Sequence, residues 1–178
     1  AAVPGMEAGL TFSANISGAA PGISPRGIVN GASFAPGDSP LAPGSIISIF
    51  GQGFLTPGTA PLFAPSVPLP TVLGGVQVRV LSPIGERAAA LFYVSERQIN
   101  CQLPAELTEN PVRIFVRTGV VATDPVTITL APTAPGLFSQ NSSGRGPGAI
   151  LNQNLSPNSA DNPEARGNVI VIYGTGQG

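Results

Sequence analysis

The chain has 178 residues, of which 10% are charged and 42% hydrophobic, and its formal net charge at neutral pH is -1. Such low charge excludes the basic surface with which proteins bind nucleic acid, and no apolar run of about 18 residues predicts a membrane span. Histidine, the commonest general base and zinc ligand, is absent, so we expect a non-catalytic protein without cofactor or metal.

Glycine (23 residues) and proline (20 residues) are abundant. Both disfavour long helices, glycine through backbone entropy and proline through its missing amide donor. The composition therefore predicts an all-β fold in which short apolar strands are separated by many turns, as in a sandwich or barrel.

The first predicted strand lies at residues 9–17, where apolar and polar side chains alternate. The apolar positions are Leu10, Phe12, Ala14 and Ile16. Successive side chains of a strand point to opposite faces, so this pattern predicts one buried face. We interpret residues 1–26 as an N-terminal strand and linker, either the end of a preceding module or a strand donated to another molecule.

Residues 27–135 contain the signals of one complete sandwich. The run SIISIF at 45–50 is apolar on both faces, as in a central strand covered on each side. Four further segments alternate and are predicted as strands with one buried face: 76–80, 99–103, 112–117 and 126–130. Cys101 falls in one of them between Ile99 and Leu103, which predicts a buried structural thiol.

The longest irregular segment of this module is residues 54–71, which contains five prolines. Irregular segments of this length are uncommon in compact domains. Two interpretations are open: a polyproline-like strap that packs Phe54 and Phe63 over the sandwich, or a binding edge for a neighbouring chain.

Two internal matches indicate that the repeat unit is a whole domain. IISIFGQG at 46–53 matches VIVIYGTG 123 positions later, and the tripeptide at 28–30 matches the one at 150–152. A second match, GAAPGISP with PTAPGLFS, has an offset of 114 positions. We therefore predict that residues 136–178 are the opening of a second, incomplete module, with NVIVIY at 168–173 as its central strand. Such a half-module leaves strand edges open.

The acidic residues are scattered and give no paired-carboxylate signal. Asp161 and Glu164 lie in SPNSADNPEARG, where ordinary turn chemistry and a calcium site are the two interpretations, the first being preferred.

The order IVNGASF, APGSIISIFG, FYVSERQIN and APGLF resembles the IPT/TIG domain, which has an immunoglobulin-like fold. It is most similar to uncharacterised C-terminal modules of large secreted bacterial proteins. The resemblance covers about residues 27–131 and restarts at 148–178. It implies an immunoglobulin-like β-sandwich in an extracellular or cell-surface setting, and it carries no catalytic residues.

Two functional hypotheses follow. In the first, the protein is a structural or adhesive module that assembles with other copies of itself, or with adjacent modules of its own chain, by strand addition into a filament. Its expected assembly residues are Leu10, Phe12, Ala14, Ile16, Val169, Val171 and Tyr173. In the alternative, the module binds carbohydrate or another surface ligand within a larger secreted protein. The expected contact residues are Phe54, Phe63 and Phe115.

Overall fold

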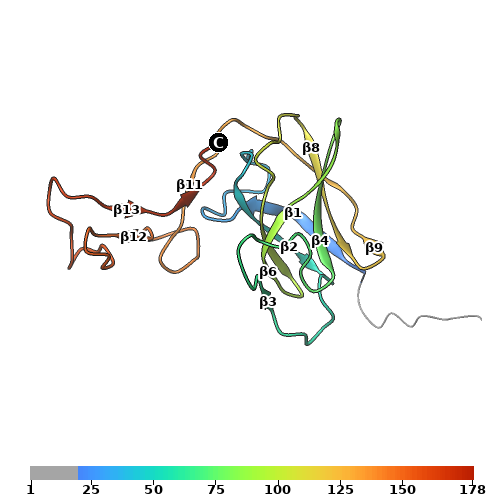
Figure 1. The fold of residues 1–178 in the computed structure, drawn as a ribbon, viewed down its shortest axis with the longest axis horizontal. Helices are drawn as coiled ribbons and strands as arrows, with labels where there is room; N and C mark the ends of the chain where they lie inside the picture. The colour runs from blue at the N-terminus through green and yellow to red at the C-terminus, as the bar shows by residue number, and fades with distance from the viewer. Residues whose placement is uncertain (1–19) are drawn as a thin grey trace, which may run out of the picture.

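The computed structural model describes residues 20–178, which form two stacked sheets and an extension (Figure 1). This part of the chain contains strands and turns only, so the predicted all-β fold is confirmed. None of its segments is a helix that could cross a membrane.

The first sheet has five antiparallel strands in the order β1-β2-β7-β6-β3. Their bounds are Gly22–Asn30 (β1), Ile46–Gln52 (β2), Leu62–Phe63 (β3), Ala90–Val94 (β6) and Gln98–Gln102 (β7). The apolar run at 45–50 therefore lies inside the sheet, paired with β1 on one edge and β7 on the other. The irregular segment supplies the edge strand β3, which pairs with β6.

The second sheet has the order β10-β8-β4-β5, with the short β9 also paired to β8. Its strands are Val76–Ser82 (β4), Gly85–Ala88 (β5), Val112–Thr118 (β8), Val121–Ala122 (β9) and Val126–Ile128 (β10). Burial alternates strictly along β4, as its sequence predicts. The strand predicted at 126–130 is shorter, because beyond Ile128 the chain turns to bridge Leu130 with Leu41.

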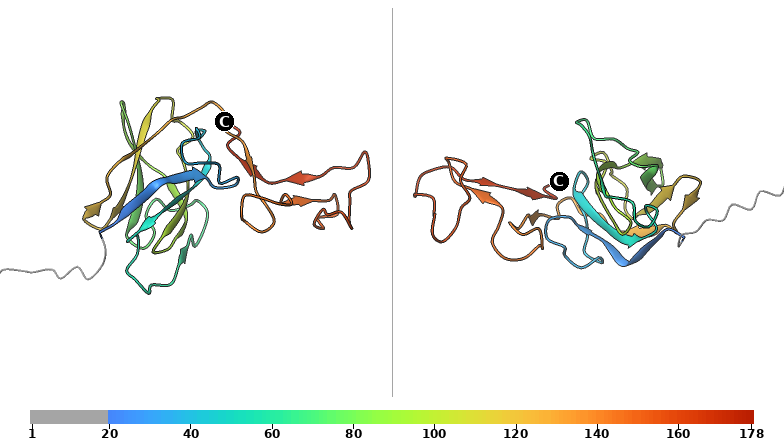
Figure 2. Two further views of the ribbon diagram at one scale, coloured as in Figure 1. Left: turned by 180° about the vertical axis from the view of Figure 1, so that it is seen from behind. Right: turned by 90° about the horizontal axis from the view of Figure 1, so that it is seen from below.

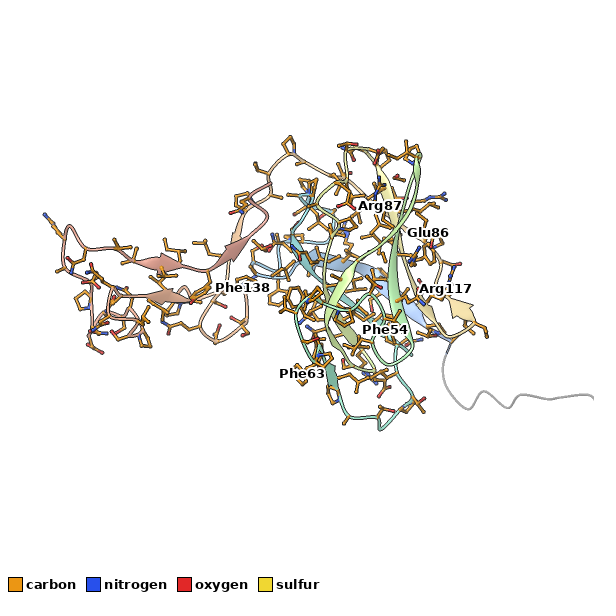
Figure 3. All side chains as sticks on the ribbon, in the orientation of Figure 1. Phe54, Phe63, Glu86, Arg87, Arg117 and Phe138 are labelled. Carbon is orange, nitrogen blue, oxygen red and sulfur yellow. The ribbon has the colours of Figure 1, made fainter. Side chains whose placement is uncertain are left out.

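The core lies between the two sheets, where side chains from both inner faces meet (Figure 3). In the first sheet one row of cross-strand neighbours is entirely apolar: Ile28, Ile49, Ile99, Val94 and Leu62. The second sheet contributes the valines of β4 and the inward residues of β8. Cys101 is fully buried in this core, as predicted, and burial raises the pKa of its thiol.

The strand β1 crosses the module boundary expected between residues 26 and 27. It begins at Gly22, which already pairs with Gln52, and Ile23 packs against the core. A register shift between Ile23 and Ile28 divides the strand into two ladder segments. Residues 22–26 thus belong to the sandwich.

An extension, here called the arm and comprising residues 136–178, projects from one end of the sandwich (Figure 2). It contains two short antiparallel pairs. Their strands are Gly136–Leu137 (β11) with Gly174–Thr175 (β14), and Ile150–Leu151 (β12) with Val171–Ile172 (β13).

Candidate functional site: the C-terminal arm

The arm repeats the pairing of the first two strands of the sandwich. In the sandwich, Ile28 pairs with Ile49; in the arm, Ile150 pairs with Ile172. The next pairs along the two ladders, Val29 with Ser48 and Leu151 with Val171, are related by the same sequence offsets. At the other end of the ladders, the pairing of β11 with β14 matches that of residues 22–23 with residues 51–52. The arm therefore has the register of a first strand pair, with a longer loop at 138–149 in place of residues 24–27.

A buried asparagine lies where the first strand ends in both copies: Asn30 is the last residue of β1, and Asn152 directly follows β12. Asn30 accepts hydrogen bonds at Oδ1 from the amides of Ala32 and Ser33. Asn152 donates from Nδ2 to the Asn162 carbonyl and accepts at Oδ1 from the Asn158 side-chain Nδ2 at 2.7 Å. Both side chains organise the loop that leads to the second strand, so the likeness of the two copies extends to side-chain chemistry.

The two copies differ in burial. Ile49 of β2 is 0% exposed, whereas the equivalent Ile172 is 49% exposed. Ser48 is 2% exposed, and its equivalent Val171 is 38% exposed. We expected a strand at 168–173 that is covered on each face. Within the described chain this segment is exposed to solvent, and only its residues Val171–Ile172 form a strand. The reason is that β13 has one neighbouring strand where β2 has two, and no opposing sheet.

The free edge of β13 is formed by particular peptide groups. The Tyr173 amide donates to the Ala149 carbonyl on the β12 side at 3.2 Å. Peptide groups of an antiparallel strand alternate between its two edges, so those of Ile170 and Ile172 face away from β12. In β2 the equivalent residues Ile47 and Ile49 pair with β7. Unpaired peptide groups beside exposed apolar side chains make this edge a surface that can accept another strand.

Hydrogen bonds attach the base of the arm to the sandwich. Thr175 accepts at Oγ1 from the Ile46 amide, which opens β2, at 2.7 Å. Ala134, on the connecting segment, accepts from the Asn30 side chain and donates to the Gly176 carbonyl. Gly176 has a φ of 81°, and a Cβ there would meet the Ala134 carbonyl oxygen, so glycine permits the close approach.

The distal loop of the arm is held by polar contacts. Glu164 accepts hydrogen bonds from the Asn168 side chain at 2.8 Å and from the amides of Gln153 and Ala165. These hydrogen bonds lower the pKa of the Glu164 carboxyl below its usual range, and the bond from Asn168 has the largest effect. Between residues 20 and 178 no three His, Cys, Asp or Glu side chains gather as metal ligands. Through these bonds Glu164 is a hydrogen-bond acceptor for its own loop.

Three of the predicted assembly residues lie exposed on the arm: Val169, Val171 and Tyr173. The other four, Leu10, Phe12, Ala14 and Ile16, lie outside the described residues. By register, however, the arm residues equivalent to the core-facing Ile47 and Ile49 are Ile170 and Ile172. Sequence reasoning missed these two, although the 123-position offset could have identified them.

Two of the predicted ligand contacts are buried. Phe54 lies within the sandwich (Figure 3), since Gly51 has no Cβ and leaves room for the Phe54 ring. Phe115 is on the outer face of the second sheet, but Arg79 lies beside it across the ladder and the Arg117 guanidinium is 5.8 Å from its ring centroid. Neither ring is therefore available as an exposed contact. Phe63 on β3 is exposed, as the alternative hypothesis requires.

Comparison with known proteins gives no independent identification: no protein-family model matches the chain, and no curated protein matches its sequence.

Proposed function

We propose that the chain is a non-catalytic structural module of an extracellular or cell-surface assembly, and that its arm is half of a second immunoglobulin-like sandwich. One observation carries the proposal. The arm reproduces the ladder of β1 and β2 in register, yet its strand β13 is exposed where β2 is buried. An apolar strand with a free edge is the arrangement to which a further strand adds. The extracellular, bacterial setting and the adhesive role rest on the resemblance to IPT/TIG-type modules.

The sandwich itself provides a template for the strand that would complete the arm. There, Ile47 and Ile49 of β2 pair with Cys101 and Ile99 of β7. A strand added to the arm would make the same ladder with the peptide groups of Ile170 and Ile172. It would also cover their side chains with apolar residues at alternate positions. Residues 9–17 have this alternation, and we take that segment of a second copy as the donor.

The placement of the strands favours head-to-tail contact. The strand β1 begins on the side of the sandwich away from the arm (Figures 1 and 2). The segment that precedes β1 in one copy would therefore meet the arm of the next copy. A heterologous contact of this kind propagates into a filament when its rotation does not close a ring, and a filament is the assembly that we propose.

The test is the assembly state of the intact chain, measured by sedimentation velocity over a range of concentrations and by negative-stain electron microscopy. We expect filaments for the wild-type chain. We expect monomers after deletion of residues 1–20, or when Ile172→Asp places a charge in the added ladder. The matched control is Val120→Asp, which alters a 99% exposed valine in the turn between β8 and β9 and should leave assembly unchanged.

Normal filaments from the deletion variant would overturn the proposed donor strand. Equal loss of assembly in Val120→Asp and Ile172→Asp would overturn the proposed surface. A wild-type chain that stays monomeric at every concentration would rule out self-assembly and leave adjacent modules of the same polypeptide as the partner of the arm.

A further inference from the structure

The outer face of the first sheet carries a second row of cross-strand neighbours, beside the apolar row that faces the core. Its members, in order across the sheet, are Val29, Ser48, Asn100, Tyr93 and Phe63. The row runs from β1 to the edge strand β3 and becomes aromatic and exposed at that edge: Phe63 is 69% exposed. This face has no covering sheet within residues 20–178.

A groove of about 680 Å³ lies at the aromatic end of this row. It is lined by residues of β6 and β7, by Phe63 of β3 and by the proline-rich segment 64–69 that follows β3. The volume is in the range of sites for small ligands. The groove is on the sandwich and shares no residue with the arm.

The lining combines aromatic rings with carboxamides. The rings of Phe63 and Tyr93 meet edge to face, with centroids 5.2 Å apart. Asn100 accepts at Oδ1 from Ser48 Oγ at 3.0 Å and from Gln98 Nε2 at 2.9 Å. These two bonds fix both carboxamides, and within the described chain they leave Asn100 Nδ2 as a free donor and Gln98 Oε1 as a free acceptor.

No lining side chain is charged at neutral pH. This excludes strong recognition of a phosphate, sulfate or uronate group, for which a charged or multiple-donor site is needed. A neutral saccharide fits the chemistry better, because its ring has apolar C–H faces that pack on aromatic rings and hydroxyls that pair with carboxamides. Because the groove is open to solvent, it suits one segment of a longer glycan.

We infer that this groove binds a neutral saccharide, with Phe63 and Tyr93 as the stacking surface and Asn100 and Gln98 as the hydrogen-bonding groups. The inference is independent of the strand addition proposed for the arm. Of the three expected ligand contacts, only Phe63 belongs to the proposed site. Phe54 and Phe115 are buried, and the other members of the site are the residues that line the groove with Phe63.

The experiment is titration of the intact chain with neutral oligosaccharides of glucose, xylose and N-acetylglucosamine, followed by calorimetry and by NMR shifts of the Asn100 and Gln98 side-chain amides. We expect at least one series to bind and to shift these signals. Phe63→Ala should weaken that binding about tenfold or more, in line with the loss of an aromatic stacking contact. Because Phe63 is largely exposed, the variant should fold normally, and its unfolding curve verifies this.

The matched control is Tyr173→Ala, which removes an exposed aromatic ring from the arm and should leave saccharide affinity unchanged. Conversely, Phe63→Ala should assemble as the wild type does, so the two proposals can fail separately. The inference is overturned if no neutral series binds, if Phe63→Ala binds as tightly as wild type, or if a proline-rich peptide or an anionic glycan is the only ligand that shifts the Asn100 and Gln98 amides.

Discussion

Two equivalent isoleucines, one in the sandwich and one in the arm, should differ in how much their substitution by alanine lowers the free energy of unfolding. Ile49 is fully buried between Ile28 and Ile99, whereas Ile172 has Ile150 as its cross-strand neighbour on one side and is half exposed. Ile49→Ala should lower the free energy of unfolding by about 2–5 kcal/mol, the range for a buried isoleucine that leaves a cavity. Ile172→Ala removes a side chain already half in water, so it should cost less than about 1 kcal/mol.

Both variants are compared with wild type by urea unfolding at concentrations where the chain is monomeric. A lower midpoint with an unchanged slope reports the loss of stability directly. Equal losses for the two variants would refute the reasoning, because Ile172 would then already lie in a packed core. A loss below about 1 kcal/mol for Ile49→Ala would likewise contradict the assignment of its row to the core.

Two further predictions concern single groups. Cys101 should not react with a thiol reagent at pH 8 until denaturant unfolds the chain, because burial raises its pKa and excludes the reagent; prompt reaction of the native chain would contradict this. Hydrogen bonds to the Glu164 carboxylate lower its pKa, so its stabilisation of the distal loop is present at neutral pH and is lost as the pH falls through the lowered folded-state value. The protection factors of the Gln153 backbone amide and the Asn168 side-chain amide, which donate to Glu164, should therefore fall in acid once the intrinsic slowing of exchange is corrected for, and Glu164→Gln, whose protection should be low at both pH values, is the control.

Much of the fold could be predicted because it depends on alternation. The valines of β4 and the inward residues Ile99 and Cys101 of β7 were identifiable from their spacing, since a strand with one buried face has a period of two. The repeat offsets also relate the residues that pair in the arm to those that pair in the sandwich, although the sequence analysis did not draw that register from them.

Other features depend on contacts that no local pattern encodes. Phe54 follows a glycine-rich turn and was expected either to pack over the sandwich or to contact a ligand, and the missing Cβ of Gly51 lets its ring enter the core. Phe115 occupies an outward position that Arg117 and Arg79 cover from the sides. The amide pair of the groove also depends on register, because Ser48 and Asn100 become neighbours only when β2 pairs with β7.

The exposure of β13 illustrates the same limit. Its sequence is similar to that of β2. An apolar run predicts a strand that is covered on both faces, but it does not say which part of the protein, or which partner, covers it. The sandwich supplies β7 and the second sheet to β2. The described chain supplies neither to β13.

Hydrogen exchange at the free edge of β13 tests the central claim most directly. In the monomeric chain, the amides of Ile170 and Ile172 should exchange rapidly, while the Tyr173 amide, bonded to Ala149, should exchange more slowly. On assembly, Ile170 and Ile172 should become protected together, as Ile47 and Ile49 are by β7 in the sandwich. Assembly that leaves these two amides unprotected would contradict the account, because the contact would then not be an added strand.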